Sequence, residues 1–253
     1  MANKIEKQFL DTENKGPVRL NKYLSEAGVC SRREADKLIA AGQVTVDGVR
    51  AETGMKVEPW QVVRIGKKQV SRQEEMIALA VNKPRGIVCT EERRERDSIV
   101  RFLNYPVRIT YVGRLDKDSE GLLLMTNNGD IINRMMRAAN KHEKEYKVTV
   151  DKPVTDEFLK EMAGGVPILD TVTRPCQVEK LGKYKFKIIL TQGLNRQIRR
   201  MCEALGYEVK ELRRVRIMNI ELGNLKPGEY RKVTDQELNE QTELSSDSKS
   251  EPT

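Results

Sequence analysis

The sequence predicts an α+β protein of two domains, a small one near the N-terminus and a larger one built on a largely antiparallel mixed sheet. Three observations lead to this prediction. Helical spacing of apolar residues is confined to short segments, strand-like runs recur from residue 44 onward, and the two patterns do not alternate strictly. The length of 253 residues is enough for one large or two modest domains.

The first domain, predicted over residues 17–66, begins with two helices. Residues 1–16 are polar, and we expect them to be disordered. Apolar residues then recur at helical spacing from Leu20 to Ala27, and Gly28 can end that helix in a left-handed conformation. Ser31 and Glu34 have the spacing of a capping box, which predicts a second helix ending near Gly42.

A hairpin completes the predicted first domain. Val44–Val46 reads as a strand, and Asp47-Gly48 is a dipeptide typical of a tight hairpin turn. Residues 57–65 supply further strand. The polar stretch 67–75 that follows is predicted to be a linker.

The second domain is predicted over residues 76–234. The segment IALAVNKPRGIVCT reads as a strand, a Lys-Pro turn and another strand. Later strands are expected at 122–126, 146–150 and 185–191, and helices at 155–162 and 197–205. Residues 235–253 carry six acidic residues and one basic residue, and we expect a disordered acidic tail there.

Composition restricts the chemistry. A net charge of +8 and a pI near 9.2 favour a polyanionic partner. The four cysteines form no CxxC pair, which favours buried free thiols in a reducing cytoplasm over a zinc ribbon. His142 is the only histidine, so metal sites with several histidines are excluded. The sequence has no membrane-spanning run and no apolar core of a signal peptide, so a cytoplasmic protein is expected.

The segment GRLDKDSEGLLLMTNNGD, residues 113–130, is the most informative in the chain. Asp116 lies in a polar turn that Gly113 and Gly121 flank, before an apolar run. A carboxylate held beside a buried strand has the setting that nucleophilic or acid–base chemistry needs. A turn aspartate that bonds its own backbone is the ordinary alternative, and the local pattern by itself favours it.

This segment closely resembles the signature of the RsuA/RluB/RluE/RluF family of RNA pseudouridine synthases. The resemblance extends from about Val18 to about Thr234 and is closest to the RluF branch, which acts on large-subunit (23S) ribosomal RNA. It implies the pseudouridine synthase fold, with an active-site cleft across the sheet. It also implies an isomerase that needs no cofactor and no metal, acts as a monomer, and uses Asp116 as its catalytic residue.

The segment RLNKYLSEAGVCSRREADKLIAAGQVTVDG resembles the S4 RNA-binding domain. Between residues 17 and 72 there are 11 basic and 6 acidic residues, a net charge of +5. The expected phosphate contacts are Arg19, Lys22, Arg32, Arg33 and Lys37, although a solvated helix face is the ordinary reading of such charges.

The resemblance assigns roles to further residues. Arg199, in LTQGLNRQIRRM, matches the late-motif arginine and is expected to pair with Asp116. Tyr146, in HEKEYKV, matches the active-site tyrosine, which could stack on the flipped uracil and relay the C5 proton. By spacing alone, Arg199 would be read as a surface arginine, and Tyr146 as an ordinary strand tyrosine. Both a covalent adduct of the aspartate and a glycal-like intermediate fit these residues.

Three residues are expected to support the site and two to contact RNA. Lys83 and Pro84, in VNKPRG, match the family's first motif, and with Gly113 we interpret them as structural. Arg114 and Lys117, beside Asp116, are expected to contact phosphates near the flipped nucleotide, or else to be plain surface charges.

Two other functions compete with the synthase. One is an RNA-binding module without catalysis, which the presence of Asp116, Tyr146 and Arg199 together disfavours. The other is a hydrolase that pairs Asp116 with a second acid, for which Asp118 is the nearby candidate. Residues two apart in a turn rarely face the same point, so the sequence disfavours this reading. A synthase acting on small-subunit ribosomal RNA or on transfer RNA is the alternative within the family.

Overall fold

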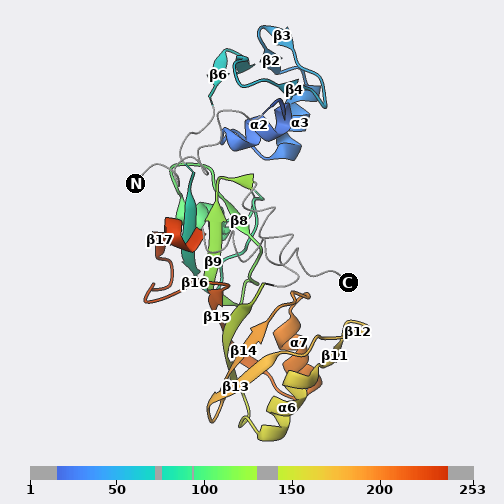
Figure 1. Cartoon of the computed structure of the whole chain (residues 1–253), viewed down its shortest axis with the longest axis vertical. Helices are drawn as coiled ribbons and strands as arrows, with labels where there is room; N and C mark the ends of the chain where they lie inside the picture. The colour runs from blue at the N-terminus through green and yellow to red at the C-terminus, as the bar shows by residue number, and fades with distance from the viewer. Residues whose placement is uncertain (1–15, 72–75, 93, 130–141, 239–253) are drawn as a thin grey trace. The chain divides into compact units, whose positions relative to one another are not determined.

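The computed structural model describes residues 16–71, 76–92, 94–129 and 142–238 (Figure 1). The chain divides into two compact units, with the boundary between Met76 and Ile77. The expected disorder of residues 1–15 and of 239–253 concerns parts of the chain outside the described residues.

The described residues of the first unit form two short helices and a small sheet. Helices α2 (Leu20–Glu26) and α3 (Arg32–Ala40) pack against one another. The capping box predicted before α3 is present, because Glu34 N donates to Ser31 Oγ at 3.2 Å and Ser31 N donates to the Glu34 carboxylate. Apolar side chains of both helices are buried against the strands in one hydrophobic core.

The strands of the first unit include one that was predicted as linker. A sheet runs in the order β3 (Val49–Arg50), β2 (Val44–Val46), β5 (Val63–Ile65) and β6 (Lys68–Val70), and β1 (Val18–Arg19) pairs with β4 (Lys56–Val57). The β2–β3 turn has positive φ at Asp47 and Gly48, as the hairpin prediction requires. The linker prediction for 67–75 is wrong for β6, because Val70 is buried in the core although its neighbours are polar.

A mixed sheet organises the second unit. Its order is β13 (Gln177–Gly182), β14 (Lys185–Leu190), β10 (Lys144–Val150), β15 (Val209–Ile217), β9 (Glu120–Thr126), β7 (Ala78–Lys83) and β17 (Tyr230–Lys232). Strand β8 (Thr110–Val112) pairs with β9, and β16 (Ile220–Glu221) pairs with β15. Between named strands of the described residues, β15 with β9 is the one parallel pairing, so the predicted α+β class and largely antiparallel sheet are confirmed.

The parallel pairing depends on one glycine. Gly121 lies opposite Arg214 in the β9–β15 register and has φ +107°. A Cβ atom on Gly121 would lie 2.2 Å from the backbone oxygen of Arg214, which no real structure tolerates. The glycine therefore lets β15 join the two halves of the sheet, between β10 and β9 (Figure 1).

Two hydrophobic cores lie among the described residues of the second unit. One is built on β10 and β14 with helices α6 (Asp156–Gly164) and α7 (Gln197–Ala204), and the other on β7 and β9 with α4 (Ile99–Leu103). A short hairpin, β11 (Pro167–Ile168) and β12 (Thr171–Val172), lies beside α7. Tyr146 of β10 packs against both cores, which places it at their junction.

The predicted acidic tail starts later than expected. Residues 235–238 form a helical turn that Thr234 and Glu237 cap reciprocally, since Glu237 N donates to Thr234 Oγ1 and Thr234 N to Glu237 Oε2. Arg231 donates two hydrogen bonds to the same carboxylate, at 2.7 and 2.8 Å. The prediction of disorder from residue 235 is therefore wrong for these four residues. The Glu237 carboxylate is not simply exposed to solvent, because it caps the helical turn and forms an ion pair with Arg231.

Candidate active site

Asp116 lies in the loop between β8 and β9, and neighbouring segments fix that loop. Ser119 N donates to Asp116 O at 3.1 Å, which closes a turn around the aspartate. The next segment upstream contributes through Gly86, whose N–H donates to Lys117 O at 2.7 Å. Leu115 fixes the loop to the protein, because its side chain is buried in the core of β7 and β9 and its N–H donates to Cys89 Sγ.

The Lys-Pro turn is built around a buried ammonium. Lys83 is fully buried, and its Nζ donates to Pro84 O at 2.9 Å and to Ile87 O at 2.7 Å. Burial lowers the pKa of Lys83, and the nearby charges of Asp116 and Asp118 oppose that shift. This lysine shapes the turn that Gly86 joins to the Asp116 loop.

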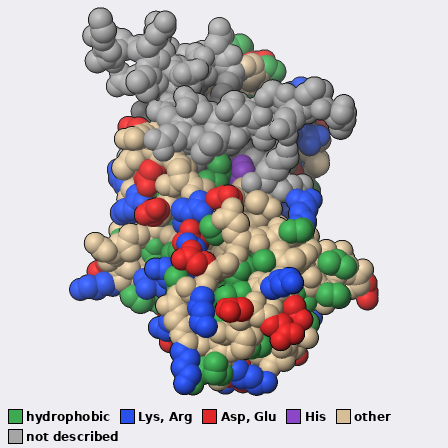
Figure 2. Space-filling view, turned by 60° about the horizontal axis from the view of Figure 1, so that its bottom comes forward, with side chains coloured by type: hydrophobic (Ala, Val, Ile, Leu, Met, Phe, Trp, Pro, Cys, Tyr) green, Lys and Arg blue, Asp and Glu red, His purple; other side chains and the backbone are tan. Residues whose placement is uncertain are grey.

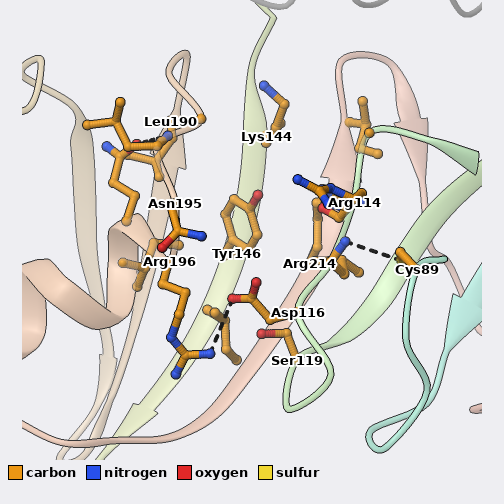
Figure 3. A pocket seen from close by; sticks show the side chains of 18 of the residues that line it. Cys89, Arg114, Asp116, Ser119, Lys144, Tyr146, Leu190, Asn195, Arg196 and Arg214 are labelled. Carbon is orange, nitrogen blue, oxygen red and sulfur yellow. Dashed lines mark hydrogen bonds and ion pairs between the residues drawn. The ribbon is translucent and has the colours of Figure 1, made fainter. Parts of the chain in front are cut away.

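The arginine that pairs with Asp116 is not the expected one. Arg196 Nη1 lies 3.7 Å from Asp116 Oδ2 (Figure 3). The Arg196 guanidinium also donates two hydrogen bonds of 3.2 Å to the Asp118 carboxylate. Arg196 has φ +49° at the residue before α7, a backbone conformation that residues other than glycine rarely adopt. In the sequence nothing distinguishes it from the neighbouring arginines, so this contact was missed.

Arg199 holds the loop and not the carboxylate of Asp116. Its guanidinium donates to Asp118 O at 3.0 Å, to Ser119 Oγ at 3.4 Å and to Val209 O at 3.3 Å. Its Nε also lies 3.5 Å from the Asp118 carboxylate. The expected Arg199–Asp116 pair is thus replaced by Arg199–Asp118, because one turn of α7 separates Arg199 from the residue that reaches Asp116.

Asp116 and Asp118 do face the same point, contrary to the sequence-based expectation. The turn closed by Ser119 directs both carboxylates to Arg196. Burial raises the pKa of Asp118, but hydrogen bonds from Arg196 and the charge of Arg199 outweigh it, so the pKa lies below its ordinary value. An acid held ionised in this way cannot donate a proton near neutral pH, which disfavours a hydrolase using Asp118 as its acid.

A cavity of about 1000 Å³ opens above Asp116. Its walls come from the Asp116 loop, from β10 and β15, and from the segment between β14 and α7. Tyr146 of β10 stands in the middle of the cavity, with Asp116 at one end of its ring (Figure 3). The cavity is large enough for an extruded nucleotide, and a half-buried ring at its centre offers a flat face for a base.

Basic residues that sequence reasoning did not select line the other end of the cavity. Lys144 and Tyr146 lie at alternate positions of β10, so the strand period places both toward the cavity, and His142 before the strand also lines it. Arg214 is the β15 partner of Tyr146 in the sheet register, and its side chain is only 3% exposed. The alternation along β10 could have pointed to Lys144, whereas the pairing with Arg214 has no sequence signal.

Similarity to known proteins decides the family. Residues 77–204 match the RNA pseudouridylate synthase family and residues 18–73 match the S4 domain family. The dual-specificity RNA pseudouridine synthase RluF of Escherichia coli strain K12 is 53% identical over 236 residues, which are 92% of this chain and 81% of the relative.

The chain belongs to the RNA pseudouridylate synthase family.

Other relatives of this synthase agree. An uncharacterized RNA pseudouridine synthase of Mycobacterium tuberculosis strain H37Rv is 36% identical over 235 residues, covering 87% of this chain and 91% of the relative. A crystal structure of a pseudouridylate synthase superimposes with a TM-score of 0.65 at 29% identity, covering 88% of this chain and 99% of the other. The predicted enzyme class, an RNA pseudouridine synthase with an S4 domain, is confirmed.

The S4 unit of the synthase carries the basic residues expected to contact RNA. Arg19, Arg32, Arg33 and Lys37 are exposed, and Lys22 forms an ion pair of 3.4 Å with Glu26. In the second unit, Arg114 is exposed at the cavity, and exposed Lys117 lies 3.4 Å from Asp97.

The described part of the synthase offers no cluster of metal ligands and no membrane-spanning helix. No group of three or more His, Cys, Asp or Glu side chains in that part is placed to hold a metal ion. None of its helices is long and apolar enough to cross a membrane. Its four cysteines are free thiols, and Cys30, Cys89 and Cys202 are buried.

Proposed function

We propose that this synthase isomerises a uridine in or beside a loop of large-subunit (23S) ribosomal RNA, with Asp116 as its catalytic carboxylate. The observation that carries the proposal is the position of Asp116, held by Arg196 at the base of a cavity that Tyr146 divides. The choice of the large subunit rests on the resemblance to the RluF branch. A loop is favoured because extruding a base costs least where stacking and pairing are already imperfect.

The reaction needs few groups. The bond between uracil N1 and ribose C1′ breaks, the base turns, and a bond forms between C5 and C1′. The proton on C5 leaves and N1 gains one, so atoms and electrons balance without an oxidant or a cofactor. Asp116 attacks or assists at the sugar, and Tyr146 holds the detached base by stacking and relays the C5 proton through its hydroxyl.

The two arginines have different roles in this proposal. Arg196 orients the Asp116 carboxylate through a contact that is exposed enough for an incoming sugar to displace it. Arg199 is mostly buried and holds the loop through the backbone oxygen of Asp118 and the side-chain oxygen of Ser119. Lys83, Pro84 and Gly113 shape the same loop from its other side.

The S4 unit supplies affinity. Its exposed basic side chains suit phosphate contacts that carry no sequence information, so the choice of uridine falls to the second unit. We place the synthase in the cytoplasm as a monomer, where ribosomal RNA is its partner and no metal or cofactor is needed. Acting on small-subunit ribosomal RNA or on transfer RNA remains the alternative, and the word dual-specificity in the relatives' names favours testing it.

Substituting Asp116→Asn tests the catalytic assignment. The amide keeps the shape of the carboxylate and loses its charge, so tritium release from C5-tritiated 23S ribosomal RNA should cease while RNA affinity stays within a few-fold. Turnover within tenfold of the wild type would remove Asp116 from the catalytic role.

Deleting the gene tests the substrate. Pseudouridines in ribosomal and transfer RNA would be mapped by reverse-transcription stops after carbodiimide treatment. Loss of at least one large-subunit site is expected. Loss of a small-subunit or transfer-RNA site with every large-subunit site intact would overturn the choice of substrate and leave the enzyme class standing.

A further inference from the structure

Three cationic side chains meet at the end of the cavity away from Asp116. Lys144 lies on β10, Arg214 on the neighbouring β15, and Arg114 two residues before Asp116 in the loop. In Figure 3 they lie above the level of the Asp116 carboxylate, on the hydroxyl side of the Tyr146 ring. The cavity thus has one cationic end. At its other end, the positive charge of Arg196 balances the negative charges of Asp116 and Asp118.

The three cations have no carboxylate partner among the residues that the structure describes. Lys144 Nζ donates to a backbone oxygen, that of His142, at 3.4 Å. Arg214 donates to Leu122 O at 2.7 Å and to Arg114 O at 3.5 Å, and in the described part of the chain its Nη2 has no hydrogen-bond partner although it is buried. Burying a guanidinium N–H without a hydrogen-bond partner costs desolvation free energy, and an anion bound to that N–H would offset this cost.

We propose that Lys144, Arg214 and Arg114 form a phosphate subsite, which binds a backbone phosphate of the RNA next to the flipped uridine. The proposal rests on the proposed function, because the uridine must leave its stack for that phosphate to reach the cavity. Arg214 fixes the subsite, since two backbone oxygens hold its side chain. Lys144 and Arg114 supply the adaptable contacts.

A phosphate fits this end of the cavity better than the uracil does. Uracil is neutral and can accept hydrogen bonds from one or two donors, whereas three cations offer more charge than its carbonyls can use. Burial and the charge of Arg214 lower the pKa of Lys144, and a bound phosphate would oppose that shift. On the face shown in Figure 2, basic and acidic side chains are intermixed, whereas the three cations of the cavity have no carboxylate partner among the described residues.

The test compares Lys144→Gln and Arg114→Gln with Lys147→Gln. Lys147 lies on the same strand but is exposed and outside the cavity, so it is a matched control for general charge. Affinity for a 23S ribosomal RNA transcript is measured by filter binding from 50 to 300 mM salt, and kcat and KM by tritium release. Lys144→Arg serves as the conservative variant, and thermal denaturation confirms that each variant is folded.

The subsite predicts a specific pattern. Lys144→Gln should weaken binding and raise KM about tenfold, change kcat by less than threefold, and flatten the salt dependence by about 0.7 in log–log slope. Arg114→Gln should act in the same direction, Lys144→Arg should recover most of the affinity, and Lys147→Gln should match the wild type.

Two results would overturn the subsite. If Lys144→Gln lowers kcat with binding and slope unchanged, Lys144 acts in the chemistry and not on a phosphate. If Lys147→Gln flattens the slope as much as Lys144→Gln, general charge explains the effect. Absence of tritium release by the wild type on any ribosomal RNA would instead refute the proposed function. That result comes from the wild type alone, whereas the subsite is judged from the differences between the variants and the wild type.

Discussion

Replacing Arg196 with Gln removes the guanidinium that joins Asp116 and Asp118, while Arg199→Gln removes the one that holds the loop backbone. Arg196 makes two hydrogen bonds of 3.2 Å and one ion pair of 3.7 Å, but its side chain is 42% exposed. Solvent screens such contacts, so we expect Arg196→Gln to lower the free energy of unfolding by only about 1 kcal/mol. Its effect on the reaction should be much larger.

The catalytic loss from Arg196→Gln follows from positioning. Without its partner the Asp116 carboxylate can rotate away from the sugar, and a misplacement of about 1 Å costs roughly 100-fold in rate. Arg199 differs because its side chain is 12% exposed and donates to two backbone oxygens, those of Asp118 and Val209. Arg199→Gln leaves those acceptors without a donor, and we expect a loss of about 2–4 kcal/mol in unfolding free energy.

The assay combines urea denaturation with tritium release under single-turnover conditions. Arg196→Gln should be nearly as stable as the wild type and about 100-fold slower, and Arg196→Lys should recover part of the rate. Arg199→Gln should lose both stability and rate. If Arg196→Gln reacts within threefold of the wild type while Arg199→Gln is stable but inactive, the assignment of the two arginines is reversed and the reasoning fails.

Four further predictions follow from particular residues. Tyr146→Phe should fold and bind RNA but lose much of its rate, and a rate equal to the wild type would leave Tyr146 with stacking alone. Gly121→Ala should cost about 3 kcal/mol in a urea titration, because its Cβ meets backbone at 2.2 Å, while Gly113→Ala, with open space around it, should cost about 1 kcal/mol; equal costs would contradict the close approach. Burial and the charge of Lys144 lower the pKa of His142, so the folded state favours its neutral form. The free energy of unfolding should therefore be retained above the ordinary pKa near 6.5 and fall as the pH drops below it. His142→Gln should flatten that decline. Removing residues 1–72 should weaken RNA binding and reduce its salt dependence, measured by filter binding, and an unchanged salt slope would count against the phosphate contacts of the S4 unit.

The sequence by itself determined the local structure and the family. The capping box at Ser31, the hairpin at Asp47-Gly48 and the apolar run before Thr126 depend on interactions within a few residues, so their patterns could be read directly. The GRLD turn identified the family and, through it, the role expected for Asp116. Local patterns failed at β6 and at residues 235–238, where burial of Val70 and the Glu237–Arg231 pair outweigh a polar composition.

The tertiary structure decided which side chains meet. Arg196 and Asp116 are 80 residues apart, and their contact depends on a left-handed backbone at Arg196 and on the register of β9 with β15. Arg214 reaches the cavity because it pairs with Tyr146 across two strands, and β15 reaches β9 because Gly121 has no side chain. Such contacts arise from the packing of distant segments, and a single sequence carries no periodic signal for them. The catalytic role expected for Asp116 could therefore be read from one turn of the sequence. The side chains that surround Asp116 could be identified only from the fold.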